Sequence, residues 1–88
     1  MRIKIKGKMW DFVRTQFDVT KQWGSCDRPG VKGKKIKVAA KLRGVNELNT
    51  IIHECLHAGF DSLDEEHVDE FATDLARVLW RLGYRRDQ

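Results

Sequence analysis

A His-Glu-x-x-His pattern at residues 53–57 constrains this 88-residue chain more than any other feature. His53 and His57 are four residues apart, so a helix would project them from one face, about 40° apart in azimuth. Two imidazole nitrogens at that spacing can reach one zinc ion, each at roughly 2.0–2.1 Å. Glu54 points about 100° further round the helix, where it can act on the attacking water without binding the metal. The pattern therefore predicts a helix that carries a Zn²⁺ site, with Glu54 as the catalytic general base.

The side of this helix opposite the histidines is predicted to pack against the rest of the domain. Leu48, Ile51, Ile52 and Cys55 cluster there, so one face would be buried while the other holds ligands. The motif fixes only three of its five positions, and the alternative is a surface helix with a solvated Glu-His pair. The apolar opposite face and the acidic helix that follows favour the zinc-site interpretation.

Length and composition indicate one globular domain over residues 1–88. The chain is 41% hydrophobic and 34% charged, which is ordinary for a globular protein. No apolar run approaches the roughly 18–20 residues that span a membrane, so no membrane partner is expected. The charged, alternating start Met1–Lys4 suits a first strand better than a secretion signal, and we expect a cytoplasmic protein.

The first half of the chain has the periodicity of strands. Residues 2–6 alternate polar and apolar, as do residues 35–40, so each predicts a short half-buried strand. Residues 9–23 are rich in aromatic and β-branched side chains, which favours one or two further strands, although a helix also fits. Several glycines and one proline predict a loop over residues 24–34.

Two helices are predicted after the strands. Asn46 is the expected N-cap of the first, which would run through the motif to Ala58 and end with Gly59 in a left-handed conformation. Asp64 is the expected N-cap of the second, and Gly83 would stop it. One apolar stripe marks the second helix: Val68, Phe71, Ala72, Leu75, Leu79 and Leu82. The predicted fold class is α+β, with a small antiparallel sheet followed by an active-site helix and a long C-terminal packing helix.

A hydrolytic zinc site needs a third protein ligand in addition to the two motif histidines. The start of the second helix is the obvious source, because a tight turn at 59–64 would fold it back beside the first. With Val68 at the centre of the packing face, Glu65 lies about 60° to one side and His67 about 100° to the other, while Glu66 points about 160° away. Glu65 is therefore the preferred third ligand, with His67 and Glu66 as alternatives.

Residues 35–84 resemble small HExxH metallopeptidases, especially the ImmA/IrrE-like and SprT-like groups and their short phage or bacterial relatives. The resemblance covers the strand at 35–40, the motif helix, and the acidic-start helix that carries Phe71-Ala72. In the ImmA/IrrE-like group a Glu precedes a comparable Phe-Ala pair by four positions. Here that position is His67, which leaves the third ligand open.

The resemblance implies a minimal zincin with a gluzincin-like site that hydrolyses a peptide bond in a protein or peptide substrate. Glu54 would take a proton from the attacking water and pass it to the leaving amine. Tyr84 or an arginine could stabilise the oxyanion, and the sequence does not place either.

The two cysteines form no Cys-x-x-Cys unit and are expected to be reduced. Cys55 falls on the buried side of the motif helix and is most simply a small core residue. Cys26 lies in the Gly/Pro-bounded loop, where a zinc-capping role is the alternative to a plain loop thiol.

The net charge of +4 is distributed unevenly. Lysines crowd residues 1–44, whereas acids collect after the motif. The basic half could make a weak contact with nucleic acid or an acidic partner, but its interleaving with apolar residues favours the solvated face of an edge strand. The alternative function is therefore a non-catalytic, zinc-stabilised module that binds nucleic acid or a protein through this half.

Overall fold

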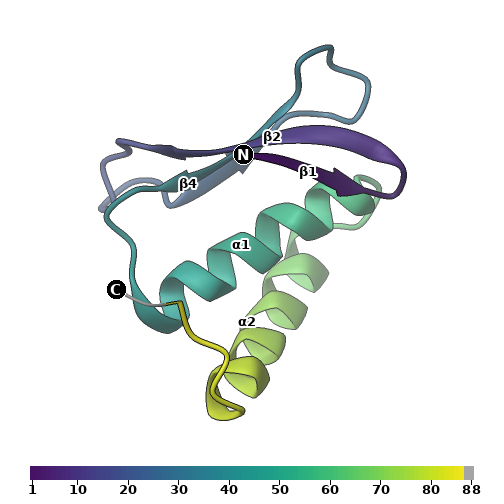
Figure 1. Ribbon diagram of the computed structural model, residues 1–88. Coiled ribbons are helices and arrows are strands. Elements are labelled where there is room, and N and C mark those ends of the chain that lie inside the picture. The colour runs from purple at the N-terminus through teal and green to yellow at the C-terminus, as the bar shows by residue number, and fades with distance from the viewer. Residues whose placement is uncertain (87–88) are drawn as a thin grey trace.

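A computed structural model describes residues 1–86, in which four strands come first and two helices follow (Figure 1). In chain order the elements are β1 (Arg2–Ile5), β2 (Lys8–Thr15), β3 (Gly24–Cys26), β4 (Lys35–Ala39), α1 (Gly44–Gly59) and α2 (Glu65–Arg81). The sheet, α1 and α2 form three successive layers, with α1 in the middle (Figure 1). The predicted α+β class is confirmed. No helix within residues 1–86 combines the length and apolarity needed to cross a membrane.

A tight hairpin joins the first two strands. Lys6 and Gly7 form its two-residue connection and both have positive φ, 48° and 78°, the conformation that matches the twist of paired strands. The strand predicted at residues 2–6 is confirmed as β1, which ends at Ile5 because Lys6 belongs to the turn. Within residues 9–23, the strand alternative is confirmed by β2, which ends at Thr15.

The sheet is mixed, so the expectation of an antiparallel sheet is wrong. Its order is β1-β2-β4-β3, and β2 runs parallel to β4 with Phe12 opposite Ile36, whereas the other two pairings are antiparallel. Alternation along a strand determines which side chains share a face, but it does not determine the direction of the neighbouring strand. The connection over residues 16–34 exceeds the dozen residues that a parallel crossover needs.

The predicted loop over residues 24–34 contains a strand, which corrects that part of the sequence analysis. Gly24–Cys26 form β3, which pairs antiparallel with β4 at the edge of the sheet. Three residues are too few to show a periodic pattern, and β3 forms because β4 offers it an edge to pair with. This edge strand borders the candidate site described below.

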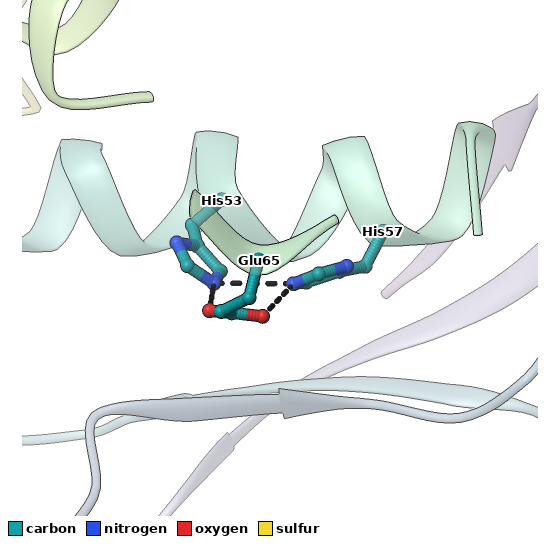
Figure 2. A group of neighbouring side chains, drawn as sticks. All are labelled: His53, His57 and Glu65. Carbon is teal, nitrogen blue, oxygen red and sulfur yellow. Dashed lines mark hydrogen bonds and ion pairs between the residues drawn. The ribbon is translucent and has the colours of Figure 1, made fainter. Parts of the chain in front are cut away.

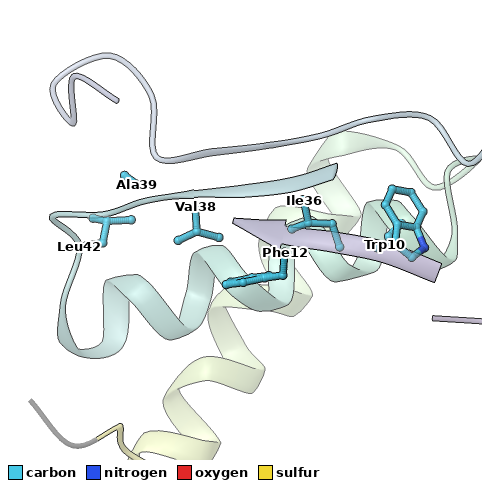
Figure 3. Close-up of a cluster of buried hydrophobic side chains, with 7 residues drawn as sticks. Trp10, Phe12, Ile36, Val38, Ala39 and Leu42 are labelled. Carbon is cyan, nitrogen blue, oxygen red and sulfur yellow. The ribbon is translucent and has the colours of Figure 1, made fainter. Parts of the chain in front are cut away.

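Most of the hydrophobic core lies between the sheet and α1 (Figure 3). Its buried members are Trp10, Phe12, Ile36, Val38, Ala39, Leu42 and Ala58. Ile51 and Cys55 pack against this cluster, as the sequence predicts for one side of the motif helix. The most deeply buried positions of α1 are nonetheless Glu47, Thr50, Glu54 and Ala58, so three polar side chains lie on the buried face.

Both ends of α1 differ from the prediction. The helix begins at Gly44 after Arg43, which caps it without a side-chain hydrogen bond, so Asn46 lies inside the first turn. Gly44 has a φ of 69°, a conformation that glycine adopts easily and that lets the chain enter the helix early. Gly59 is helical and has no positive φ. Its missing side chain matters because a Cβ there would lie 3.4 Å from Ile5 Cγ2 on β1.

Asp64 is confirmed as the N-cap of α2, and Gly83 follows its end with a φ of 92°. The predicted single packing stripe is only partly correct. Val68, Ala72 and Ala76 are buried, whereas Phe71 and Leu82 are exposed. Among the described elements α2 packs against α1 alone (Figure 1).

Candidate metal centre

α1 presents His53 and His57 side by side at the groove between β3 and the start of α2. Their Nε2 atoms lie 3.2 Å apart, and the two rings meet edge to face with centroids 4.9 Å apart. This arrangement follows from the four-residue spacing on an α-helix, as the sequence predicts. Both side chains are partly buried, so the two nitrogens converge on one sheltered point.

Glu65 completes a three-residue group of metal-binding side chains (Figure 2). Its carboxylate oxygens lie 2.8 Å from His53 Nε2 and 2.9 Å from His57 Nε2. Three ligands held tetrahedrally at 2.0–2.1 Å from zinc are about 3.3 Å apart. One ligand atom from each of these three side chains lies within 4.8 Å of the other two, so small side-chain movements would complete a ligand triangle. Two imidazoles and one carboxylate with an open fourth position are a donor set that suits catalytic zinc. The group therefore fits Zn²⁺ in both geometry and chemistry.

The other two residues considered for the third ligand lie outside this group. The His67 Nδ1 atom is 2.8 Å from Asp64 Oδ2, so its ring is held at the helix cap and away from His53 and His57. Glu66 is exposed in the first turn of α2 and is not among the three clustered side chains. Glu65 is thus the residue that the fold brings to the histidines.

Glu54 is a buried carboxyl group beside the three ligand candidates. Its side chain is buried, and burial, followed by the nearby charge of Glu65, raises its pKa to about 7. Within residues 1–86 no cation opposes this shift. A carboxyl group with a pKa near neutrality can exchange a proton with substrate at physiological pH, as a general base must.

Gly24 on β3 explains how Glu54 becomes buried. A Cβ on Gly24 would lie 2.8 Å from Thr50 Cγ2, 2.9 Å from the Lys37 carbonyl oxygen and 3.1 Å from Glu54 Cγ. The glycine therefore allows the edge strand to lie directly against α1 at the level of Glu54. This close approach is absent from the sequence interpretation, which treated residues 24–34 as a loop.

Two hollows meet at Glu54 and His57 and together form what we call the cleft. The first has a volume of about 380 Å³ and contains the three ligand candidates together with Glu54. Its remaining lining residues are Trp23, Gly24, Asn49, Thr50 and Asp69. The second hollow, of about 460 Å³, shares Glu54 and His57 with the first and adds Cys26, Asp27, Arg28 and Asp61. The cleft therefore extends from the three ligand candidates past Glu54 and His57 toward Cys26 and Arg28.

The structure shows where Cys26, Tyr84 and one arginine lie relative to the cleft. Cys26 lines its second hollow but lies outside the metal-binding group within residues 1–86, and burial raises its thiol pKa to about 12. Tyr84 lies with Gly44 and Glu47 at the opposite end of α1, so it cannot reach the reactive centre. Arg28 is the arginine that lines the cleft.

Sequence reasoning missed Trp23 and Asn49 as cleft residues. Trp23 is 40% exposed beside the first hollow, and its indole nitrogen donates to the Val19 carbonyl oxygen. The one sequence feature that could have indicated its place in the cleft is its position directly before Gly24. Asn49 lies one turn before His53 on α1 and donates to the Thr73 hydroxyl of α2.

The comparisons with known proteins assign this chain to no family. No family model, no curated protein and no solved structure matches it at a significant level. The likeness to HExxH metallopeptidases is therefore a proposal that depends on the side chains described above.

Proposed function

We propose that this chain is a zinc-dependent peptidase. His53, His57 and Glu65 would hold Zn²⁺, and Glu54 would serve as the general base. The observation that carries the proposal is the convergence of three ligand atoms beside a buried carboxyl group with a pKa of about 7. A zinc site that only stabilised the fold would need no such carboxyl group, because structural sites are closed by a fourth protein ligand.

In this proposal Glu54 and Asp69 each have a defined task. Zinc, when bound, polarises the scissile carbonyl group and makes water more acidic. Glu54 removes a proton from the attacking water and then delivers it to the leaving amine. Asp69 Oδ1 lies 3.7 Å from His53 Nδ1, where it favours the ring orientation that directs Nε2 into the site.

The substrate that suits this cleft is an extended peptide. Within residues 1–86, β3 pairs with β4 on one side, and its other edge faces no strand. The Gly24 carbonyl oxygen accepts from Gln22 Nε2, so a further strand on that edge would displace this side chain. A peptide laid along that edge would form main-chain hydrogen bonds beside Glu54 and the histidines. The two adjoining hollows would receive side chains of the peptide near the scissile bond.

The finer classification of the fold is part of the same proposal. A mixed sheet, an edge strand over the motif helix and a second helix that supplies Glu65 are consistent with a minimal zincin. An 88-residue chain offers little wall for deep specificity pockets, so we expect a narrow substrate range or modest activity.

The experiment that tests the proposal measures zinc content and hydrolysis in matched variants. Purified protein should contain about one zinc per chain, and His57→Ala and Glu65→Gln should lose it. Glu66→Gln and His67→Asn, which alter the neighbouring residues of the same helix turn, should retain it. A quenched fluorescent peptide library would then report cleavage by the wild type and none by Glu54→Gln. Absence of zinc under zinc-replete conditions, or cleavage that survives Glu54→Gln, would refute the proposal.

A second candidate function is supported by a separate observation. A hollow of about 420 Å³ beside the hairpin is lined by four cationic side chains and no acidic one within residues 1–86: Arg2, Lys8, Lys32 and Lys34. Such a surface suits the phosphates of nucleic acid, and it favours the zinc-stabilised binding module as the alternative. Binding to a labelled oligonucleotide that weakens steeply with salt, without any peptide cleavage, would support this second function over the first.

A further inference from the structure

α2 carries an apolar stripe on its outer side in addition to the face that packs against α1. Phe71, Leu75, Val78 and Leu82 are spaced by four, three and four residues, so they align along one side of the helix. Phe71 is 56% exposed, Val78 53% and Leu82 68%, while Leu75 is partly buried at the border of the packed face. Spacing of this kind is typical of a seam that receives a second helix.

No described element covers this stripe. Val68, Ala72 and Ala76 face α1, and α2 contacts no other helix or strand within residues 1–86 (Figure 1). Three large exposed side chains in line on one helix form a larger apolar surface than scattered single residues do. In a domain of this size, covering such a stripe would add materially to a small core.

The charges beside the stripe identify a second copy of the same chain as the occupant. Glu70 and Asp74 flank its N-terminal half, and Arg77 and Arg81 flank its C-terminal half on the same side. Two such helices placed antiparallel would bring the acidic half of each against the basic half of the other. Parallel placement would set this charged flank against the opposite flank of the other helix, so these ion pairs would not form.

One antiparallel register also pairs the apolar side chains of the two copies with each other. When the twofold axis passes between residues 76 and 77, Phe71 faces Leu82 of the second copy, and Leu75 faces Val78. Glu70 then lies close to Arg81 of the second copy, and Asp74 close to Arg77. A single register therefore satisfies both the apolar and the charged side chains, which is the property of an isologous interface.

We propose that two copies of this chain associate through antiparallel α2 helices, with the Phe71, Leu75, Val78 and Leu82 stripes in contact. Glu65, at the start of α2, lies more than a quarter turn away from the stripe, so the metal-binding group stays open to substrate. The proposal does not depend on zinc or on catalysis.

The test measures the mass of the full chain by sedimentation and light scattering from about 1 to 200 µM. We expect a concentration-dependent dimer, and Phe71→Ser or Val78→Ser should raise its dissociation constant about tenfold or more. Val31→Ser is the matched control, because Val31 is a comparably exposed valine, 43%, in the loop before β4. All these positions are on the surface, so circular dichroism should show unchanged folding.

Orientation is tested with cysteine variants. Phe71→Cys mixed with Leu82→Cys should form a mixed disulfide, whereas each alone should form little, because antiparallel helices separate identical positions near their ends. A monomer throughout the concentration range would overturn the proposal, as would a dimer indifferent to Phe71→Ser and Val78→Ser. A dominant disulfide between two Phe71→Cys chains would overturn the antiparallel arrangement.

Discussion

Glu47 and Glu54 are both buried on the same face of α1, two turns apart, yet their surroundings are opposite. Burial raises the pKa of Glu47, but the hydrogen bond from Arg86 and the charges of Arg14 and Arg86 outweigh it and lower the pKa below its ordinary value. Arg14 Nη1 lies 2.6 Å from Glu47 Oε2 and Arg86 Nη2 2.9 Å from the same atom. Glu54 receives no cation within residues 1–86, and its pKa rises to about 7.

The difference separates a structural carboxylate from a reactive one. Glu47 connects β2, α1 and the segment after α2, because its two arginine partners come from the first and the last of these. Glu54 is buried without a compensating cation, which reduces stability, and a carboxyl group of this kind is a candidate for a role in catalysis. Two identical side chains on one helix face therefore have different roles because of what the rest of the fold places beside them.

The largest expected effect is a loss of catalytic activity that should follow substitution of Glu54 but not of Glu47. Glu54→Gln should lower kcat/KM by roughly 10²–10⁴-fold, because the general base is lost while the side chain keeps its shape. Glu47→Gln should leave kcat/KM within about twofold at a temperature where it remains folded. Peptide hydrolysis by zinc-loaded protein measures both. Equal losses of activity in two folded variants would show that the distinction is wrong.

Stability should rank the same two variants in the opposite order. Glu47→Gln should reduce the free energy of unfolding by about 2–4 kcal/mol near neutral pH, because Arg14 and Arg86 lose a buried counter-charge. Urea unfolding followed by circular dichroism measures the change, with exposed Glu66→Gln as the control. The folded-state pKa of Glu47 is depressed, so its contribution should be present above about pH 4.5 and disappear as the pH falls through the folded-state value.

In the metal-free protein Glu54→Gln should be stabilising. The folded state holds the Glu54 proton up to a pKa of about 7, whereas the unfolded state releases it near the ordinary value of 4.5. The folded state thus binds more protons in this window, so wild-type stability falls as the pH rises through it. Above about pH 7 the variant should exceed the wild type by about 3 kcal/mol, with a smaller difference near pH 5. Unfolding in the presence of a chelator tests this, and a destabilised variant would contradict it.

The sequence predicts those features that depend on local spacing. The convergence of His53 and His57 follows from four residues on a helix, and the Asp64 cap from one side chain beside the first turn. The preference for Glu65 over Glu66 follows from helix azimuth in the same way. Such features need no knowledge of the remaining chain.

Features that depend on distant partners were not predictable in this way. The direction of β4 relative to β2 and the pairing of β3 are determined by which strands meet, and single-strand periodicity does not carry that information. The burial of Glu54 requires the backbone of Gly24 from another element. The partners of Glu47 lie 33 and 39 residues away in sequence. The apolar residues predicted to form one stripe on α2 are partly buried and partly exposed, because α1 covers only some of them.

The smallest expected effect concerns an exposed carboxylate at the edge of the same site. Asp69 Oδ1 is 3.7 Å from His53 Nδ1, beyond hydrogen-bond distance, and its side chain is 71% exposed. Asp69→Asn should therefore weaken zinc binding only about two- to tenfold, at or below the low end for groups that orient a metal ligand. Competition with a fluorescent chelator measures this, with Glu66→Gln as the control. A loss of a hundredfold or more would mean that Asp69 moves into direct contact with His53 when zinc binds, and that exposure alone does not separate structural from functional carboxylates here.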